Sequence, residues 1–319
     1  MPASSSPFLR RAMLYVPASS QRMLTKSLGL TVDTVIYDLE DSVNAEVKAE
    51  ARDALYQHLR RLPAKPPHVS EIAVRVNNAR SPFIEKDLKL AASSFVVDTV
   101  IVPKVSNIGD LREVSHILKN LENKHFKDAR EKPLRVMAMI ESARAIMNLS
   151  SIVRGPRLNG LIFAAEDFAL DLSLTRTPDM SEFLYARSAL VTAARVESIP
   201  SLIDLACTSY KEKDGLDQLE KECQNGRAMG FNGKQCIHPS QVNMVQRYFT
   251  PSEKELEWAV RVNIADEKAA AEKRGAWGLD GRVIDRPVAA RAKAIVGRAE
   301  KCGLDVDGLR EKWKDQEPE

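Results

Sequence analysis

The sequence predicts an α/β fold, a (β/α)8 TIM barrel followed by a C-terminal helical arm. Eight short apolar segments alternate with longer amphipathic ones, which is typical of parallel strands joined by helices. The length of 319 residues suits one barrel with an appendage. Polar or ionisable side chains end most of the apolar segments, as expected where barrel strands converge on a shared site.

The composition is that of a globular protein, with 44% hydrophobic and 29% charged residues. Lys and Arg number 47 against 44 Asp and Glu, which is too even for a nucleic-acid surface. No apolar run is long enough to span a bilayer, so no membrane partner is expected. The cysteines are widely spaced, which favours a reduced intracellular protein, either mitochondrial or cytoplasmic: Cys207, Cys223, Cys236 and Cys302.

The predicted elements follow one another along the chain after a flexible tail at residues 1–9, which is rich in Ser and Pro. The strands are expected at Ala12–Pro17, Thr34–Glu40, Ile72–Asn77, Thr99–Lys104, Arg135–Glu141, Gly160–Asp167, Ser201–Ala206 and Gly233–His238. Helical stretches between them include Ala45–Leu62, Asp110–Leu121, Glu182–Glu197 and Leu216–Met229. An open, doubly wound sheet is the competing architecture, and periodicity alone does not exclude it.

The barrel is predicted to occupy residues 10–250 and the helical arm residues 251–319. A charged helix is expected from about Ser252 to Arg274, and a last helix begins at Pro287, a residue that suits the first helical turn. The glycine-rich segment Trp277–Asp285 between them is interpreted as a hinge.

Glu141 and Asp167 end two neighbouring apolar segments, where barrel strands would bring them together. Two carboxylates and several open positions suit Mg²⁺, which prefers oxygen ligands. The alternative is that each acid stabilises the start of the following helix, where negative charge is favourable. Spacing alone weighs the two interpretations equally.

A denser acidic cluster, Asp38, Glu40 and Asp41, follows the second predicted strand. It is interpreted as support for a metal or for basic side chains. The alternative is helix N-capping by Asp41 or Ser42, which explains at least Asp41. Arg75 lies inside an apolar segment, where an unpaired charge is costly. It is interpreted as pairing with the cluster, as stabilising a developing anion, or as doing both. Lys104 offers a similar choice, and a Schiff-base role would imply a metal-free aldolase instead.

At these positions the chain resembles the citrate lyase beta-subunit family, which includes malyl-CoA and citramalyl-CoA lyases. The matching segments occur in order over residues 10 to 290: Arg10-Arg-Ala-Met-Leu-Tyr-Val-Pro, Asp38-Leu-Glu-Asp, Val74-Arg-Val-Asn, Val102-Pro-Lys, Ile140-Glu-Ser-Ala, Gly160 to Asp167, Tyr185-Ala-Arg-Ser and Gly233-Lys-Gln-Cys-Ile-His-Pro. The resemblance implies a magnesium enzyme that is a homotrimer or a larger homo-oligomer.

The resemblance also assigns roles to individual residues. Glu141 and Asp167 would bind Mg²⁺, Arg75 would face the thioester enolate, and Asp285 on the arm would be the acid/base, often acting in a neighbouring subunit. The remaining implied contacts are with substrate or CoA: Tyr15, Lys26, Ile237 and His238. The first strand departs from the family pattern, since Pro17-Ala18-Ser19 replaces a glycine turn and the usual basic residue is displaced to Arg22.

The activity that the resemblance implies is reversible cleavage of a short hydroxyacyl-CoA, with acyl-CoA and 2-oxo acid substrates. Citramalyl-CoA, giving acetyl-CoA and pyruvate, is the favoured substrate because both halves of the chain are most similar to animal-type citramalyl-CoA enzymes. Malyl-CoA cleavage, or malate synthase or malyl-CoA thioesterase activity, is the alternative. Two further alternatives are a citrate lyase beta subunit that needs an acyl-carrier protein and a non-catalytic paralogue.

Overall fold

The computed structural model describes residues 8–125 and 132–319. It divides into two compact units, of which the first ends at Phe249 and the second comprises Thr250–Glu319. Each unit has its own apolar core, so the two are described separately below.

The flexible tail predicted for residues 1–9 lies mostly outside the described residues. Phe8, the first residue described, is half-buried. Its ring centroid lies 4.8 Å from the guanidinium carbon of Arg135, at the start of the fifth strand. This part of the predicted tail therefore contacts the first unit.

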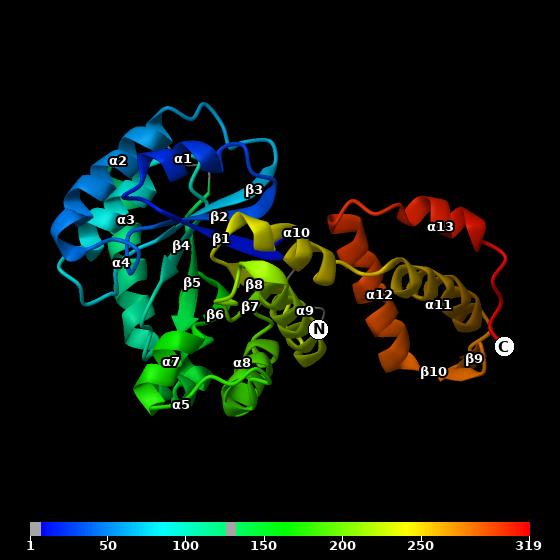
Figure 1. Ribbon diagram of the computed structural model, residues 1–319. Coiled ribbons are helices and arrows are strands. Elements are labelled where there is room, and N and C mark those ends of the chain that lie inside the picture. Colours follow the sequence, from blue (N-terminus) through cyan, green and yellow to red (C-terminus); the bar gives the residue numbers. More distant parts are fainter. Residues whose placement is uncertain (1–7, 126–131) are drawn as a thin grey trace. The chain divides into compact units, whose positions relative to one another are not determined.

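Eight parallel strands close into a barrel in the first unit, as predicted (Figure 1). Their spatial order follows the sequence, and the first strand pairs with both the second and the eighth. The strands are β1 (Ala12–Pro17), β2 (Val32–Asp38), β3 (Val69–Arg75), β4 (Thr99–Val102), β5 (Arg135–Ile140), β6 (Leu158–Phe163), β7 (Leu202–Asp204) and β8 (Gly233–Cys236). Closure excludes the open, doubly wound sheet.

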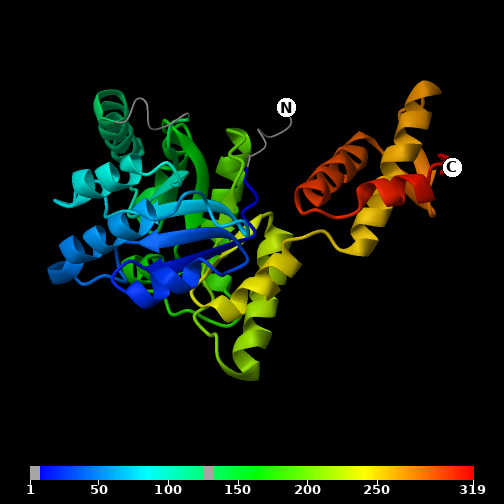
Figure 2. The same cartoon turned by 90° about the horizontal axis from the view of Figure 1, so that it is seen from above.

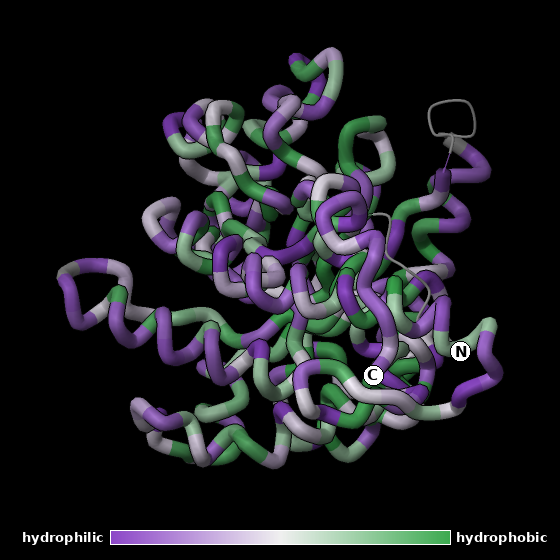
Figure 3. The backbone as a smooth tube through the Cα atoms, turned by 90° about the vertical axis from the view of Figure 1, so that its right-hand side faces the viewer, coloured by the Kyte–Doolittle hydropathy of each residue, from purple (hydrophilic) through white to green (hydrophobic). Residues whose placement is uncertain are grey.

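Helices surround these strands in both views of the first unit (Figures 1 and 2). They are α1 (Gln21–Ser27), α2 (Lys48–Arg60), α3 (Ile84–Ser93), α4 (Ile108–His125), α5 (Ala143–Met147), α6 (Leu149–Ile152), α7 (Ala165–Leu172), α8 (Leu184–Val196), α9 (Glu212–Met229) and α10 (Pro239–Tyr248), with 3-10 turns η1 (Ala45–Val47) and η2 (Ser181–Phe183). Hydrophilic and hydrophobic stretches alternate along the helices in Figure 3, as expected when one face of each helix is buried. No helix in the described ranges is long and apolar enough to cross a membrane.

The barrel interior and the layer between strands and helices form separate apolar clusters, because alternate strand residues point to opposite faces. The interior cluster consists of Met13, Ile36, Ala73, Ile101, Met137, Met139, Ile162 and Ile203. These side chains are at most 2% exposed. They fill the barrel, so chemistry is confined to its ends.

A buried ion pair closes the amino-terminal end of the barrel. The guanidinium of Arg10 donates to both carboxylate oxygens of Glu71, at 2.7 and 2.6 Å, and to Ser201 Oγ at 2.9 Å. Thr34 Oγ1 also donates to Glu71, at 2.9 Å. The Arg10 and Glu71 side chains are 1% and 0% exposed, so each charge depends on the other for compensation.

The second unit consists of α11 (Glu253–Ala271), α12 (Arg286–Lys301) and α13 (Val306–Lys312), together with two short strands. The strands β9 (Trp277–Leu279) and β10 (Arg282–Ile284) pair antiparallel, so the segment interpreted as a hinge is a β-hairpin. The buried side chains of Trp277, Leu279 and Ile284 attach this hairpin to the apolar core of the unit. The glycines had suggested flexibility, whereas alternating apolar residues determine the structure.

Candidate active site

The carboxyl ends of the barrel strands bring together most of the predicted site residues. Asp38 and Arg75 are the last residues of β2 and β3 and are paired in register. Glu141 directly follows β5, and Asp167 lies in the first turn of α7, after β6. Lys104 lies two residues beyond the end of β4, between these two groups of strands.

Glu141 and Asp167 form a carboxylate pair at this end of the barrel. Glu141 is 4% exposed. Burial and the neighbouring charge of Asp167 raise the pKa of Glu141 to about 8. The Glu141 carboxylate accepts a hydrogen bond from the backbone N–H of Lys104. No donor among the residues that the structure describes reaches the Asp167 carboxylate, which is half-buried. One backbone hydrogen bond and the nearby charge of Lys104 compensate these two acids only in part.

This pair fits Mg²⁺ in the chemistry of its donors. Magnesium takes oxygen ligands and keeps several waters, so two protein carboxylates are sufficient. Within residues 8–125 and 132–319, no group of three or more His, Cys, Asp and Glu side chains could hold a metal. Zinc and other metals that need three or four protein ligands therefore fit less well. Ser142 is the N-cap of α5, so helix capping does not explain Glu141.

Arg75 is surrounded by the acidic cluster, as the first of its two interpretations predicted. Its Nε and Nη2 donate to the two oxygens of Asp38 at 2.6 and 2.7 Å. Its Nη1 lies 3.2 Å from Asp41 and 3.1 Å from Glu40. Burial raises the pKa of Asp38, but the hydrogen bonds and charge of Arg75 outweigh it and hold that pKa below its usual range. The fork on Asp38 fixes the guanidinium plane.

Helix N-capping by Asp41 or Ser42 was wrong. The 3-10 turn that follows is capped by Asn44, whose side chain accepts from Glu46 N–H. The carboxylate of Asp41 instead pairs with Arg75 and with Lys104. The cations of neighbouring strands attract this side chain more strongly than the orphan amides of a short turn.

Glu40 and Lys104 form an ion pair at the site, as expected if the acidic cluster supports basic side chains. Lys104 Nζ donates to Glu40 Oε1 at 2.6 Å. Glu40 Oε2 is buried and forms no hydrogen bond, although Arg75 Nη1 lies nearby. Burial and the neighbouring Asp41 raise the pKa of Glu40 to about 7. Both residues follow apolar segments, which was the signal available in the sequence.

Tyr15 lies on β1 with its ring 4.8 Å from the guanidinium carbon of Arg75. Its hydroxyl donates to Gln235 Oε1 at 2.9 Å, and the amide of Gln235 donates to the carbonyls of Phe163 and Asp204. Burial raises the pKa of Tyr15, so the hydroxyl stays protonated. The aromatic face thus supports Arg75 through a cation–π contact.

The predicted CoA contacts Arg22, Lys26, Ile237 and His238 lie on α1 or directly before α10 in the first unit. Arg22 and Lys26 are exposed on α1. His238 is the N-cap of α10, and its ring stacks on Tyr210 with centroids 4.7 Å apart. Ile237 is 42% exposed. These residues follow β1 and β8, which are adjacent strands of the barrel.

Asp285 lies in the second unit, whereas the other predicted site residues lie in the first. It is the N-cap of α12, and its carboxylate accepts from Val288 N–H at 3.2 Å. Its side chain is exposed. The structure thus identifies a capping role for Asp285, while its predicted acid/base role rests on the resemblance alone.

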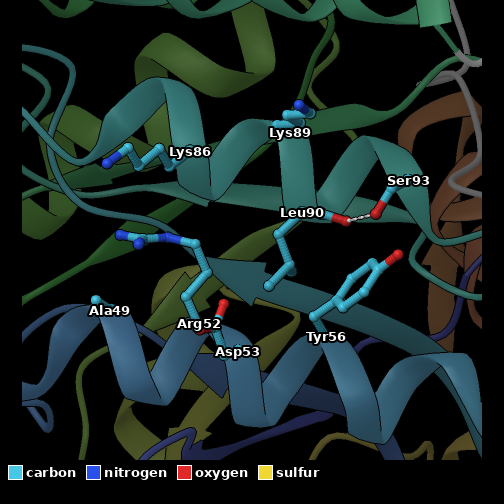
Figure 4. A pocket seen from close by; sticks show the side chains of 8 residues that line it. All are labelled: Ala49, Arg52, Asp53, Tyr56, Lys86, Lys89, Leu90 and Ser93. Carbon is cyan, nitrogen blue, oxygen red and sulfur yellow. Dashed lines mark hydrogen bonds between the residues drawn. The ribbon is translucent and has the colours of Figure 1, made fainter.

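A cavity of about 530 Å³ lies elsewhere on the first unit, between α2 and α3. Figure 4 shows Arg52 and Tyr56 rising from α2 toward α3, which carries Lys86 and Lys89. Helix side chains form its walls, and none of the predicted site residues lines it. The candidate active site is therefore the strand-end cluster and not this cavity.

Known proteins are similar in sequence to most of this chain. The sequence profile described as HpcH/HpaI aldolase/citrate lyase matches residues 11–239. A (3S)-malyl-CoA thioesterase of Cereibacter sphaeroides is 32% identical, over 91% of this chain and 94% of the relative. The mitochondrial citramalyl-CoA lyase of Homo sapiens is 30% identical, over 90% of this chain and 84% of the relative.

A solved structure is similar over both units. It is the protein CitE from Mycobacterium tuberculosis in complex with magnesium, acetoacetate and coenzyme A. The two chains are 26% identical with a TM-score of 0.71, over 92% of this chain and 98% of CitE.

Proposed function

The chain belongs to the HpcH/HpaI aldolase/citrate lyase family, and from this premise we propose that it is a magnesium-dependent lyase that cleaves citramalyl-CoA reversibly to acetyl-CoA and pyruvate. The enzyme is of an oxo-acid lyase family whose relatives act on CoA thioesters. The observation that carries the proposal is the Glu141 and Asp167 pair beside the Arg75 cluster. Carboxylates for a metal and a cation for a developing anion are the two groups that such a cleavage requires.

Glu141 and Asp167 would hold the metal, which supplies a Lewis acid for the hydroxyl and carboxylate oxygens of the substrate. The relative whose structure contains magnesium, acetoacetate and coenzyme A supports magnesium as the metal. The protein's own contribution is orientation, because the backbone N–H of Lys104 holds one of the two carboxylates.

Arg75 would stabilise the enolate oxygen of the departing acetyl-CoA. Nε and Nη2 of Arg75 donate to Asp38 at 2.6 and 2.7 Å. The third nitrogen, Nη1, is held less closely, since it lies 3.2 Å from Asp41. The Asp41 carboxylate on Nη1 is 51% exposed, so a substrate oxygen can replace it at little cost. A planar cation fixed in advance spends no reorganisation energy when the negative charge develops.

Proton balance completes the reaction. The hydroxyl of the substrate would lose its proton to water, the carbon–carbon bond would break to leave the 2-oxo acid, and the electron pair would pass to the thioester as an enolate. One proton is thus released to water and one is taken up at the enolate carbon. We propose that Asp285 then protonates the enolate carbon, or removes that proton in the direction of synthesis. The arm at residues 251–319 would deliver Asp285 within a homotrimer or a larger homo-oligomer of this chain.

A second candidate is hydrolysis of malyl-CoA, which the 32% identity to the (3S)-malyl-CoA thioesterase supports. In that reaction water attacks the thioester carbonyl and free CoA leaves, so no 2-oxo acid forms. The metal pair and Arg75 would polarise the same carbonyl, and the two reactions differ in the bond that breaks.

The deciding experiment is product analysis by mass spectrometry after incubation with citramalyl-CoA or malyl-CoA, each with Mg²⁺ and with EDTA. Magnesium-dependent formation of acetyl-CoA and pyruvate supports the proposal. Free CoA without a 2-oxo acid favours the thioesterase. Folded protein inactive on both substrates would refute a stand-alone enzyme and favour a subunit that requires an acyl-carrier protein.

A further inference from the structure

The backbone of Lys104 is unusual for its position in the fold. Its φ is +56°, in the left-handed region that non-glycine residues rarely adopt. Lys104 lies just beyond the carboxyl end of β4, and the other non-glycine residues with positive φ among the described residues are Arg157, Ser173, Met180, Ser198, Lys273 and Asp280. Lys104 is therefore a left-handed residue at the catalytic end of the barrel, where such conformations persist for a structural or functional reason.

This conformation gives the main chain of Lys104 a specific contact. Pro103 has no N–H, so Lys104 carries the first backbone donor beyond β4. That N–H donates to Oε1 of Glu141, which follows the adjacent strand β5. The Lys104 N–H therefore contacts a carboxylate that the proposed function assigns to Mg²⁺.

The side chain of Lys104 contacts the other half of the site. Its Nζ donates to Glu40 Oε1 at 2.6 Å and lies 3.4 Å from Asp41 Oδ1. Both acids also contact Arg75. A single residue thus connects the Arg75 cluster, through its ammonium, with Glu141, through its amide.

We propose that Lys104 is a positioning residue whose side-chain ion pairs hold its backbone in the left-handed conformation, so that its N–H fixes the Glu141 carboxylate for Mg²⁺. The left-handed conformation disfavours an L-residue, and the contacts with Glu40 and Asp41 offset that cost. The inference rests on the proposed function, because it takes Glu141 as a metal ligand.

Substitution by alanine and by glycine separates the backbone from the charge. Lys104→Ala removes the ammonium and keeps a Cβ, so the residue relaxes to negative φ and withdraws its N–H from Glu141. Lys104→Gly also removes the ammonium but adopts positive φ without a steric penalty. Mg²⁺ binding is therefore expected to be weakened about 5- to 10-fold in Lys104→Ala and to lie within about twofold of wild type in Lys104→Gly.

The measurement is titration calorimetry of Mg²⁺ alone into EDTA-treated full-length protein, with thermal unfolding as the check on folding. Lys273 is a matched control, since it also has a positive φ, of 60°, but belongs to the second unit. Lys273→Ala should bind Mg²⁺ as the wild type does.

Three outcomes would overturn the inference. Equal loss of affinity in Lys104→Ala and Lys104→Gly would show that the charge alone matters. Unchanged affinity in both would show that the N–H does not position Glu141. A wild-type protein that takes up no Mg²⁺ would refute the proposed metal site itself, and the inference with it.

Discussion

Replacement of Glu141 by Gln tests the charge balance of the metal pair in the absence of metal. Gln has the same shape and keeps an oxygen that can accept from Lys104 N–H, but it cannot ionise. Burial and Asp167 raise the pKa of Glu141 from 4.5 to about 8 in the folded protein. The wild type must therefore keep a proton on a buried acid, or bear an unfavourable charge there.

The sign and size of the effect follow from proton linkage. Between pH 4.5 and about 8, folded Glu141 keeps a proton that the unfolded chain has lost, so its contribution to stability falls as pH rises. At 1.36 kcal/mol per pH unit, this interval of about 3.5 units gives a destabilisation that approaches about 5 kcal/mol above pH 8. The full value is an upper bound, because water entry and relaxation reduce the cost.

The assay is thermal unfolding in EDTA from pH 5.5 to pH 9. Glu141→Gln should unfold at a higher temperature than the wild type, with an advantage that grows up to about pH 8 and is then constant. Added Mg²⁺ should stabilise the wild type and not the variant. Glu113→Gln, an exposed position on α4, serves as the control and should show no such trend. Equal unfolding temperatures of Glu141→Gln and wild type at pH 9 would refute the reasoning.

Three further substitutions address the rest of the site and the fold. Arg75→Lys loses the two parallel hydrogen bonds to Asp38 and should lower kcat about 100- to 1000-fold in steady-state assays. The circular dichroism spectrum should be unchanged, and near-normal turnover would contradict the enolate role. Glu71→Gln leaves Arg10 buried without its counter-charge and should destabilise the protein by about 3–5 kcal/mol in urea unfolding. The affinity for Mg²⁺ should be retained, because the Arg10–Glu71 pair lies at the amino-terminal end of the barrel. Asp285→Asn keeps a side chain that caps α12, so stability should hold while kcat falls at least about 100-fold; full activity would remove Asp285 from the reaction.

The sequence was informative where local pattern and topology agree. Eight apolar segments, the number of strands in a (β/α)8 barrel, predicted the strands. The polar residues at the ends of those segments predicted the cluster of Asp38, Arg75, Glu141 and Asp167. The parallel strands of a closed barrel all end on the same side, so residues that are far apart in the sequence lie close together in the site.

Other features depend on contacts between distant segments and were not accessible in this way. The left-handed backbone of Lys104 follows a Val-Pro-Lys sequence that does not require it. The pairing of Asp41 with two cations competed with helix capping, and only the fold shows which interaction is made. The second unit's hairpin was missed because its glycines obscured two strands of three residues each. Asp285 came from the resemblance, because no local pattern distinguishes a catalytic acid from a helix cap.

The five carboxyl groups at the strand ends, set against two cationic side chains, also have a thermodynamic consequence for ligand binding. The carboxyl groups belong to Asp38, Glu40, Asp41, Glu141 and Asp167, and the cations to Arg75 and Lys104. A CoA thioester is an anion, so this rim repels it unless a divalent cation is bound as well. The two ligands are therefore expected to bind with positive cooperativity. Because such coupling is reciprocal, the thioester should raise the affinity for Mg²⁺ by the same factor by which Mg²⁺ raises the affinity for the thioester.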